Sequence, residues 1–281
     1  MRSLLSQNGF LIAATTILLA SCQQYSIENP RPLASDEIRM EEAYPNQKGI
    51  WDKANIMGQE LSYQKINDDK IIDGDIIVDP SQIDNGLRTE GTYRTASSSR
   101  WPSKTVYYKI DPALANPSRV TDAINHWTTN TSIQFVLRTN QTNYVTFRTG
   151  TGCSSNVGKV GGQQYINLAT GCSTGNTIHE IGHAIGLWHE QTRKDRDTYV
   201  TVNFANIQAG YENNFKTYVA QGADGNETSG GLDFGSIMMY ASNSFSSNGL
   251  PTIVKKDGST FSVQRTALSA NDKAAVVIMY P

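Results

Sequence analysis

The stretch T-I-H-E-I-G-H-A-I-G-L-W-H-E-Q-T-R-K-D-R-D, from Thr177 to Asp197, decides how this chain folds and what it can bind. His179 and His183 are four residues apart, so on an α-helix their imidazoles project from the same face, one turn above the other. Two imidazoles in that arrangement can close on one Zn²⁺ at about 2.0–2.1 Å each. Glu180 then lies beside the metal, where its carboxylate can hold the water molecule that the metal binds.

Gly186 and His189 extend this pattern beyond the helix. Gly186 follows His183 by three residues, at a place where a helix C-cap commonly needs a residue that tolerates φ > 0. The chain can then turn back and bring His189 to the metal from a third direction. Three neutral nitrogen ligands leave the metal its full positive charge and an open fourth position, which is typical of catalytic zinc. The stretch therefore predicts a hydrolytic site.

The competing interpretation is an amphipathic helix of the core whose histidines make ordinary hydrogen bonds. The H-E-x-x-H signature alone is weak, because random chains produce it occasionally. Requiring Gly186 and His189 as well lowers the chance of a random match roughly a thousandfold. Three of the chain's 4 His residues lie in this one stretch, so the metal site is the better interpretation.

The full string resembles the consensus H-E-x-x-H-x-x-G-x-x-H-E-x-x-R-x-D-R-D of the astacin family of metzincin metalloproteases. The match covers His179, Glu180, His183, Gly186, His189, Glu190, Arg193, Asp195, Arg196 and Asp197. The resemblance implies an α+β catalytic domain with two lobes either side of a cleft, the first a twisted sheet plus two helices and the second irregular. It also implies an endopeptidase that cleaves protein or peptide substrates with one catalytic zinc ion and Glu180 as general base.

A second stretch, Gly235-Ser236-Ile237-Met238-Met239-Tyr240, resembles the Met-turn S-x-M-H-Y of the same family. The resemblance places Met238 beneath the three imidazoles. It makes Tyr240 the residue that reaches the metal in the resting enzyme and swings to the substrate. Glu190 is not expected to touch the metal, because in the family it receives, through solvent, the new N-terminal ammonium after the pro-segment is cut away.

Two expectations concern the chain just before the zinc motif. Cys153 and Cys172 match the positions of a family disulfide, and pairing is the default in an exported protein. Between them lies a predicted strand, which by the resemblance is the edge strand on which an extended peptide substrate adds by backbone pairing. That strand consists of Gln164, Tyr165, Ile166, Asn167 and Leu168.

The N-terminus has the pattern of an export signal. Arg2 precedes an apolar run, residues 10–20, which is too short to span a bilayer and fits a secretory signal. Leu19-Ala20-Ser21-Cys22 looks like a bacterial lipobox, although an ordinary signal with a nearby Cys fits equally well. We expect a signal peptide at residues 1–22 and a protein that is secreted, or anchored at the bacterial cell surface through a lipid on Cys22. No later stretch is apolar enough to span a membrane.

The acidic residues 23–91 are expected to form a pro-segment that inhibits the catalytic domain, residues 92–281. The first range carries 14 acidic and 7 basic residues, and the second carries 12 acidic and 16 basic ones, so the two attract each other. Ile72-Asp73-Gly74-Asp75 resembles the family's pro-segment motif F-x-G-D, whose aspartate binds the zinc in the latent enzyme. Cys22 is a second candidate for that ligand, because a thiolate binds zinc well and this thiol has no partner for a disulfide.

The rest of the catalytic domain shows alternating strand and helix signals. Strands are predicted at 106–110, 133–137 and 144–148. A helix that Pro117 can open has apolar positions at Val120, Ala123, Ile124 and Trp127. Ser269 and Asp272 form a capping box ahead of a C-terminal helix. The net charge of −2 and the pI near 6.1 give no reason to expect a nucleic-acid partner.

Two rival functions remain. A thermolysin-like hydrolase would use a distal Glu as its third ligand, but His189 and the Met-turn argue against it. A non-catalytic zinc-bearing surface adhesin could keep the fold and lose the chemistry. The presence of Glu180, of an open metal position and of Tyr240 disfavours the adhesin.

Overall fold

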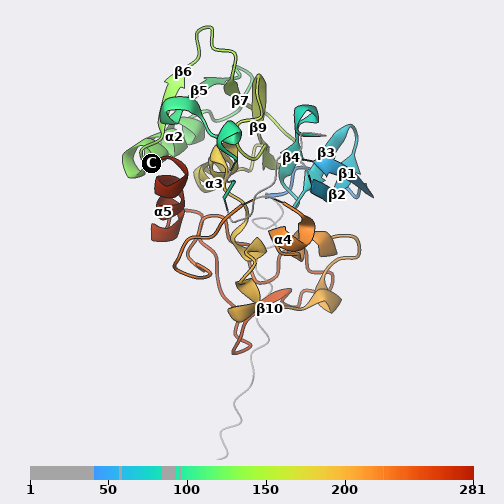
Figure 1. The fold of residues 1–281 in the computed structure, drawn as a ribbon. Helices are drawn as coiled ribbons and strands as arrows, with labels where there is room; N and C mark the ends of the chain where they lie inside the picture. Colours follow the sequence, from blue (N-terminus) through green and yellow to red (C-terminus); the bar gives the residue numbers. More distant parts are fainter. Residues whose placement is uncertain (1–40, 57–58, 84–92, 95, 224) are drawn as a thin grey trace, which may run out of the picture. The chain divides into compact units, whose positions relative to one another are not determined.

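The computed structural model describes residues 41–56, 59–83, 93–94, 96–223 and 225–281, all within one compact unit, Leu33–Pro281. The expected signal peptide, and Cys22 with it, lies outside the described residues. The architecture is α+β, as predicted: a mixed sheet with helices is followed by a lobe of little regular structure (Figure 1). Within the described part of the chain, no helix has both the length and the apolar character needed to cross a membrane.

One nine-stranded sheet joins the acidic segment to the predicted catalytic domain. Its strands are β1 (Ile50–Ile56), β2 (Gln59–Ile66), β3 (Asp69–Ile72), β4 (Ile76–Val78), β5 (Thr105–Ile110), β6 (Gln134–Leu137), β7 (Tyr144–Arg148), β8 (Cys153–Ser155) and β9 (Gln163–Leu168). Their order is β1-β2-β3-β4-β8-β9-β7-β5-β6. Strands β1 to β4 form an antiparallel meander, and β4 pairs with β8 in parallel at Ile76 and Ser155. The acidic segment is therefore folded onto the sheet and is not a solvated linker.

The prediction that residues 164–168 form the substrate edge strand is wrong. These residues lie in β9, which pairs with β7 on one side and β8 on the other. On the side next to β9, the outermost strand of the predicted catalytic domain is β8, and β4 covers its edge. The sequence misled us because β8 reads Cys-Ser-Ser, a short polar run without the alternating apolar residues that mark a strand.

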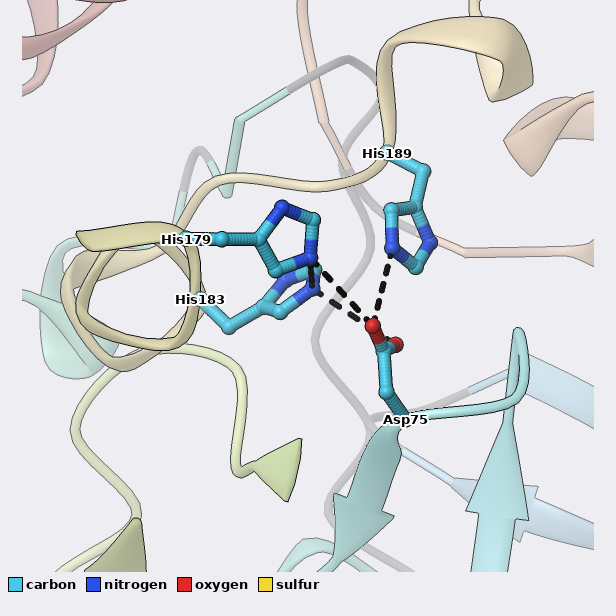
Figure 2. A group of neighbouring side chains, drawn as sticks. All are labelled: Asp75, His179, His183 and His189. Atoms are coloured by element: carbon cyan, nitrogen blue, oxygen red, sulfur yellow. Dashed lines mark hydrogen bonds and ion pairs between the residues drawn. The ribbon is translucent and has the colours of Figure 1, made fainter. Parts of the chain in front are cut away.

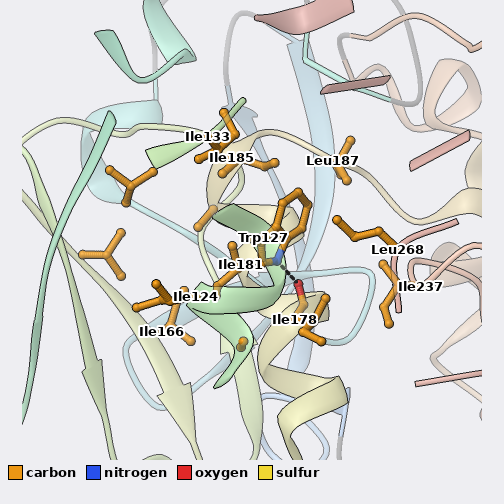
Figure 3. Packing of buried hydrophobic residues seen from close by; sticks show 14 of the residues in the cluster. Ile124, Trp127, Ile133, Ile166, Ile178, Ile181, Ile185, Leu187, Ile237 and Leu268 are labelled. Carbon is orange, nitrogen blue, oxygen red and sulfur yellow. Dashed lines mark hydrogen bonds between the residues drawn. The ribbon is translucent and has the colours of Figure 1, made fainter. Parts of the chain in front are cut away.

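Two helices pack together behind the sheet and carry the main core. They are α2 (Ser118–Asn130) and α3 (Thr174–Ile185). The apolar positions predicted for α2 are buried, and the Trp127 indole donates a hydrogen bond of 3.0 Å to the Ile178 carbonyl of α3 (Figure 3). The C-terminal helix α5 (Ala270–Met279) begins at the predicted Ser269 capping box and adds Val276 and Met279 to this core.

The second lobe has a core of its own and short elements. It contains β10 (Val200–Val202) paired with β11 (Ile253–Lys255), and α4 (Tyr218–Gln221). Its core includes Phe215, Tyr240 and Phe245.

Short 3-10 helices occur along the whole described chain, at Pro80–Gln82, Ser97–Ser99, Pro102–Lys104, Glu190–Thr192, Arg196–Thr198, Phe204–Asn206 and Glu212–Phe215. The predicted disulfide between Cys153 and Cys172 is present and ties β8 to the loop that leads into α3.

Candidate metal centre

Local sequence sets both ends of the helix that carries the first two histidines. At the start of α3, the Ser173 hydroxyl accepts the Asn176 backbone N–H at 3.1 Å, and the Asn176 side-chain Oδ1 accepts the Ser173 backbone N–H at 2.8 Å. At its end, Gly186 has φ 118°, a left-handed conformation that favours glycine. The chain therefore reverses where predicted, and His189 returns toward the helix.

The three predicted ligands meet around a carboxylate from the acidic segment (Figure 2). Asp75 Oδ2 lies 3.3 Å from His179 Nε2 and 3.2 Å from His189 Nε2, and Asp75 Oδ1 lies 3.6 Å from His183 Nε2. All four side chains are buried, and one ligand atom from each lies within 4.8 Å of the others. The structure thus brings together Asp75 and the three histidines.

The second nitrogens of two rings are held by backbone carbonyls. His179 Nδ1 lies 2.8 Å from the Ile237 oxygen, and His183 Nδ1 lies 2.8 Å from the Leu187 oxygen. A carbonyl can only accept, so each Nδ1 carries the proton and each Nε2 presents a lone pair to the centre. The two Nε2 atoms are only 3.1 Å apart. Facing lone pairs at that distance fit a shared cation, so the donor set suits Zn²⁺.

Glu180 lies next to this cluster without an interaction of its own. It is fully buried, and neither carboxylate oxygen has a hydrogen-bond partner among the residues that the structure describes. Burial raises its pKa well above the ordinary value, and the charges of Asp75 and Glu41 raise it further. An orphaned carboxylate is costly to bury. A water molecule between Glu180 and a cation would satisfy it.

The ionisation of Asp75 follows from its neighbours. Burial alone would raise the pKa of its carboxyl group, but positive charge on the adjacent His189 and His183 holds that pKa well below the ordinary value. A cation held by the same imidazoles would favour the charged carboxylate in the same way. A charged oxygen at this position is a suitable ligand for a zinc ion.

The Met-turn contacts two of the three histidines, His179 and His189. A Cβ atom on Gly182 would lie 2.7 Å from Met238 Sδ, so any larger residue at position 182 would require this methionine side chain to shift. The Tyr240 ring packs against the His189 ring, with centroids 4.5 Å apart. Its hydroxyl donates a hydrogen bond to the backbone carbonyl of Asp73.

Glu190 lies outside the metal cluster, as expected. Its carboxylate accepts the Asp233 N–H at 2.9 Å and lies 3.6 Å from the Arg193 guanidinium. Burial raises the pKa of Glu190 to about 8. The residue borders a small cavity with a volume of about 20 Å³, which is lined also by Met238 and Asp272.

Sequence reasoning missed a second contact between the acidic segment and the cleft. The Arg265 guanidinium binds both carboxylate oxygens of Glu41 and also donates to the Met239 carbonyl at 2.9 Å. Asn176, in the first turn of α3, donates to the same Glu41 carboxylate at 3.2 Å. Glu41 and Arg265 are 224 residues apart, and no spacing motif connects them, so no sequence signal could have found the pair.

The acidic segment also covers apolar surface beside the metal cluster. Trp188, which lies between Gly186 and His189, is buried in a cluster with residues of β1 to β4 and with Val157. The members contributed by the acidic segment are Ile56, Leu61, Tyr63, Ile72, Ile76 and Val78. The acidic segment thus contacts the site in three ways: through the Asp75 carboxylate, along the edge of β8, and through the apolar cluster that contains Trp188.

Comparison with known proteins agrees with this geometry. Residues 93–281 match the model of a peptidase family described as Astacin. Blastula protease 10 of Paracentrotus lividus is 41% identical over 197 residues, which cover 65% of this chain and 32% of that protein. Flavastacin of Elizabethkingia meningoseptica is 40% identical over 198 residues, which cover 64% of this chain and 42% of that protein. The chain therefore matches less than half the length of either relative.

A solved structure supports the same fold. High choriolytic enzyme 1, a hatching enzyme zinc-protease from Oryzias latipes, aligns with a TM-score of 0.60 at 31% sequence identity. The alignment covers 66% of this chain and 96% of that one. The aligned part of this chain therefore shares its fold with that zinc-protease.

Proposed function

The chain belongs to the astacin family of peptidases, and on that premise we propose that it is a zinc-dependent endopeptidase made as a latent precursor. The observation that carries the proposal is the meeting of three Nε2 atoms, from His179, His183 and His189, beside an orphaned Glu180 carboxylate. In this proposal the third ligand is a nitrogen of His189 and not an oxygen of a distal glutamate, which argues against a thermolysin-like site.

Each residue of the proposed site has a separate role in the reaction. His179, His183 and His189 would hold the zinc ion, which when bound polarises a carbonyl and lowers the pKa of water toward ~7. Glu180 takes the proton of the attacking water and passes it to the leaving amine. Tyr240, once released from Asp73, donates a hydrogen bond to the oxyanion that develops on the scissile carbonyl. Such a contact is worth roughly 3–4 kcal/mol in acyl-transfer enzymes.

Latency in this proposal comes from one short run of the acidic segment. Asp75 takes the ligand position that substrate and water would share. Two residues earlier, the Asp73 carbonyl holds the Tyr240 hydroxyl, and one residue later Ile76 pairs with the free edge of β8. Three parts of the site are thus blocked by four consecutive residues. Cys22, the other candidate, lies outside the described residues, and the position of the Asp75 carboxylate favours Asp75.

Glu41 supplies a second attachment for the pro-segment. Its carboxylate neutralises Arg265, a cation that lies against the Met-turn carbonyl and the first turn of α3. Removing the pro-segment would expose this guanidinium to the cleft. The pro-segment therefore acts as an intramolecular inhibitor that is held at Glu41 as well as at residues 73–76.

The processing and location of the protein are part of the same proposal. We assign residues 1–22 to a signal peptide, 23–91 to the pro-segment and 92–281 to the catalytic domain, as in a bacterial member of the family. The disulfide between Cys153 and Cys172 supports an oxidising compartment, because such bonds are rare in the cytosol. The product is secreted or held at the cell surface by a lipid on Cys22.

The test is hydrolysis by the processed chain. The purified precursor is cut between residues 84 and 92 by an added protease, and the product is incubated with a denatured protein substrate. Cleavage should stop with a zinc chelator and return when zinc is restored. A processed, zinc-loaded chain that leaves substrates intact would contradict the proposal and favour an adhesin.

A further inference from the structure

Asp272, in the first turn of α5, is a buried carboxylate that takes no part in the proposed chemistry. We propose that Asp272 is a positioning residue for the metal centre, and that its carboxylate ends a chain of hydrogen bonds that begins at the His179 imidazole. The inference rests on the proposed zinc function and adds Asp272 and Ser236 to the groups on which the metal depends.

The carboxylate binds three donors, two of which belong to the Met-turn. Asp272 Oδ1 accepts the Ser236 hydroxyl at 2.6 Å, and Oδ2 accepts the Ile237 N–H at 2.9 Å. The third donor is the Ser269 N–H at 2.8 Å, which belongs to the helix cap. An ionised carboxylate only accepts, so it matches three donors, and bonds to a charged acceptor are the strong ones.

A single peptide unit connects the Met-turn to the metal ligand. Its carbonyl, from Ile237, lies 2.8 Å from His179 Nδ1, and its N–H, from Met238, donates to the Ser236 hydroxyl oxygen at 3.0 Å. The Ser236 hydroxyl in turn donates to Asp272. Every donor in this path points the same way, from the imidazole through the peptide and the hydroxyl to the carboxylate.

This series of hydrogen bonds should make His179 a stronger ligand for zinc. Hydrogen bonds in series polarise one another, and a negative charge at the end favours the arrangement in which His179 keeps its proton on Nδ1. That arrangement leaves the Nε2 lone pair free and makes the imidazole a better donor to a metal. In many zinc sites a carboxylate binds the histidine directly. In this chain a peptide and a serine lie between them.

The Met-turn also fixes the third ligand. The Met238 carbonyl accepts the N–H of Glu190, the residue directly after His189, at 3.0 Å. Displacement of the turn would therefore disturb both ends of the zinc motif. His183 is held by the Leu187 carbonyl within its own loop and does not depend on this path.

The helix cap offers a matched control. The Asp272 N–H donates to the Ser269 hydroxyl at 3.0 Å, so Ser269→Ala weakens the start of α5 but leaves the bonds to Ser236 and Ile237 in place. Asp272→Asn replaces one acceptor oxygen by an NH₂ group, which must face a donor. Ser236→Ala breaks the path at its middle and leaves the Asp272 carboxylate intact.

The experiment measures zinc affinity of the metal-free full chain by competition with a chromophoric chelator, together with the Tm of each metal-free variant. Asp272→Asn and Ser236→Ala should each lower zinc affinity on the order of tenfold, the scale found for groups that support metal ligands. The double variant should lose little more than either single variant, because both break one path. Ser269→Ala should lower Tm and keep zinc affinity within about twofold.

Two results would overturn the inference. One is wild-type zinc affinity in Ser236→Ala, which stays informative even if Asp272→Asn fails to fold. The other is a loss of zinc affinity that follows the loss of Tm equally in all variants, Ser269→Ala included. Zinc affinity is measured without substrate, so a chain that binds zinc but hydrolyses nothing would refute the proposed function alone.

Discussion

The Tyr240 hydroxyl donates a hydrogen bond to the backbone carbonyl of Asp73, two residues before the carboxylate that lies among the three histidines. Burial raises the pKa of Tyr240 well above its ordinary value, and the charges of Asp75 and Asp73 raise it further, so the hydroxyl keeps its proton and remains a donor. The same tyrosine that is proposed to stabilise the oxyanion is thus hydrogen-bonded to the segment that is proposed as the pro-segment. Activation must release this bond as well as the carboxylate.

Glu180→Gln should leave zinc bound and the fold intact but lower peptide hydrolysis by at least ~10³-fold, the scale of losing a general base and its electrostatic effect. The orphaned state of the Glu180 oxygens in the latent chain motivates this expectation. The measurement is turnover of the processed variant with zinc content determined in parallel. Near-normal turnover at full zinc occupancy would remove Glu180 from the mechanism.

Tyr240→Phe should lower kcat of the processed enzyme more than it raises KM, because a contact made in the transition state is lost. An expected loss of about 3 kcal/mol corresponds to a fall of roughly two orders of magnitude in kcat. Steady-state kinetics on one peptide decide the matter. A change confined to KM would mean that Tyr240 only forms part of the wall of the cleft.

Asp75→Ala should make the uncut precursor at least ~10-fold more active than the wild-type precursor, which corresponds to about 1.4 kcal/mol of lost inhibition. Its activity should stay below that of the processed enzyme, because β4 still covers β8. Cys22→Ser is the matched control variant, and its uncut precursor should remain inactive. If the Asp75 and Cys22 double variant is as inactive as wild type with its pro-segment intact, latency is steric and not due to a ligand.

Glu41→Gln should lower the free energy of unfolding of the precursor by about 3 kcal/mol, because Arg265 would keep its charge without a carboxylate in a largely buried place. The processed enzyme serves as the control, since it lacks residue 41 and should be unaffected. Urea unfolding of both forms provides the measurement. Equal stability of the variant and wild-type precursors would show that this pair adds nothing to latency.

The same pair predicts a response to acid. Burial alone would raise the pKa of Glu41, but the charge of Arg265 holds it below the ordinary value of 4.5. A carboxyl group with a lowered pKa in the folded state stabilises that state above about pH 4.5 and loses this contribution as the pH falls through the folded pKa. The precursor should therefore become easier to process below about pH 4.5. Proteolytic cutting rates across pH, compared with Glu41→Gln, provide the measurement: the variant should show less dependence on pH in that range.

The zinc motif could be read from sequence because its geometry is local. His179 and His183 lie one turn apart on the same helix, and Gly186 ends that helix in a left-handed conformation. A run of eleven residues therefore places the side chains of His179, Glu180, His183 and His189. The capping box at Ser269 and the apolar positions of α2 are local in the same sense. Each was confirmed because the physical cause lies within one or two helical turns.

The parts that failed depend on partners far along the chain. Strand β8 is a strand because β9 and β4 pair with it, and its own Cys-Ser-Ser sequence carries no strand signal. Residue Glu41 is anchored by Arg265 across almost the whole sequence. No strands were predicted in the meander of β1 to β4, and in β1 only Ile56 is buried, so the pairing partners and not the strand's own apolar residues define it. Only the fold makes these residues neighbours.

The disulfide between Cys153 and Cys172 holds β8 in place, because Cys153 is the first residue of that strand. Cys153 begins β8, a three-residue strand that stands between two neighbours in the precursor and would keep only β9 after the pro-segment departs. A strand this short, newly at the rim of a sheet, would tend to fray. The covalent bond fastens its starting end to the chain that leads into α3, so this edge of the sheet would keep its shape if the acidic segment is removed as proposed.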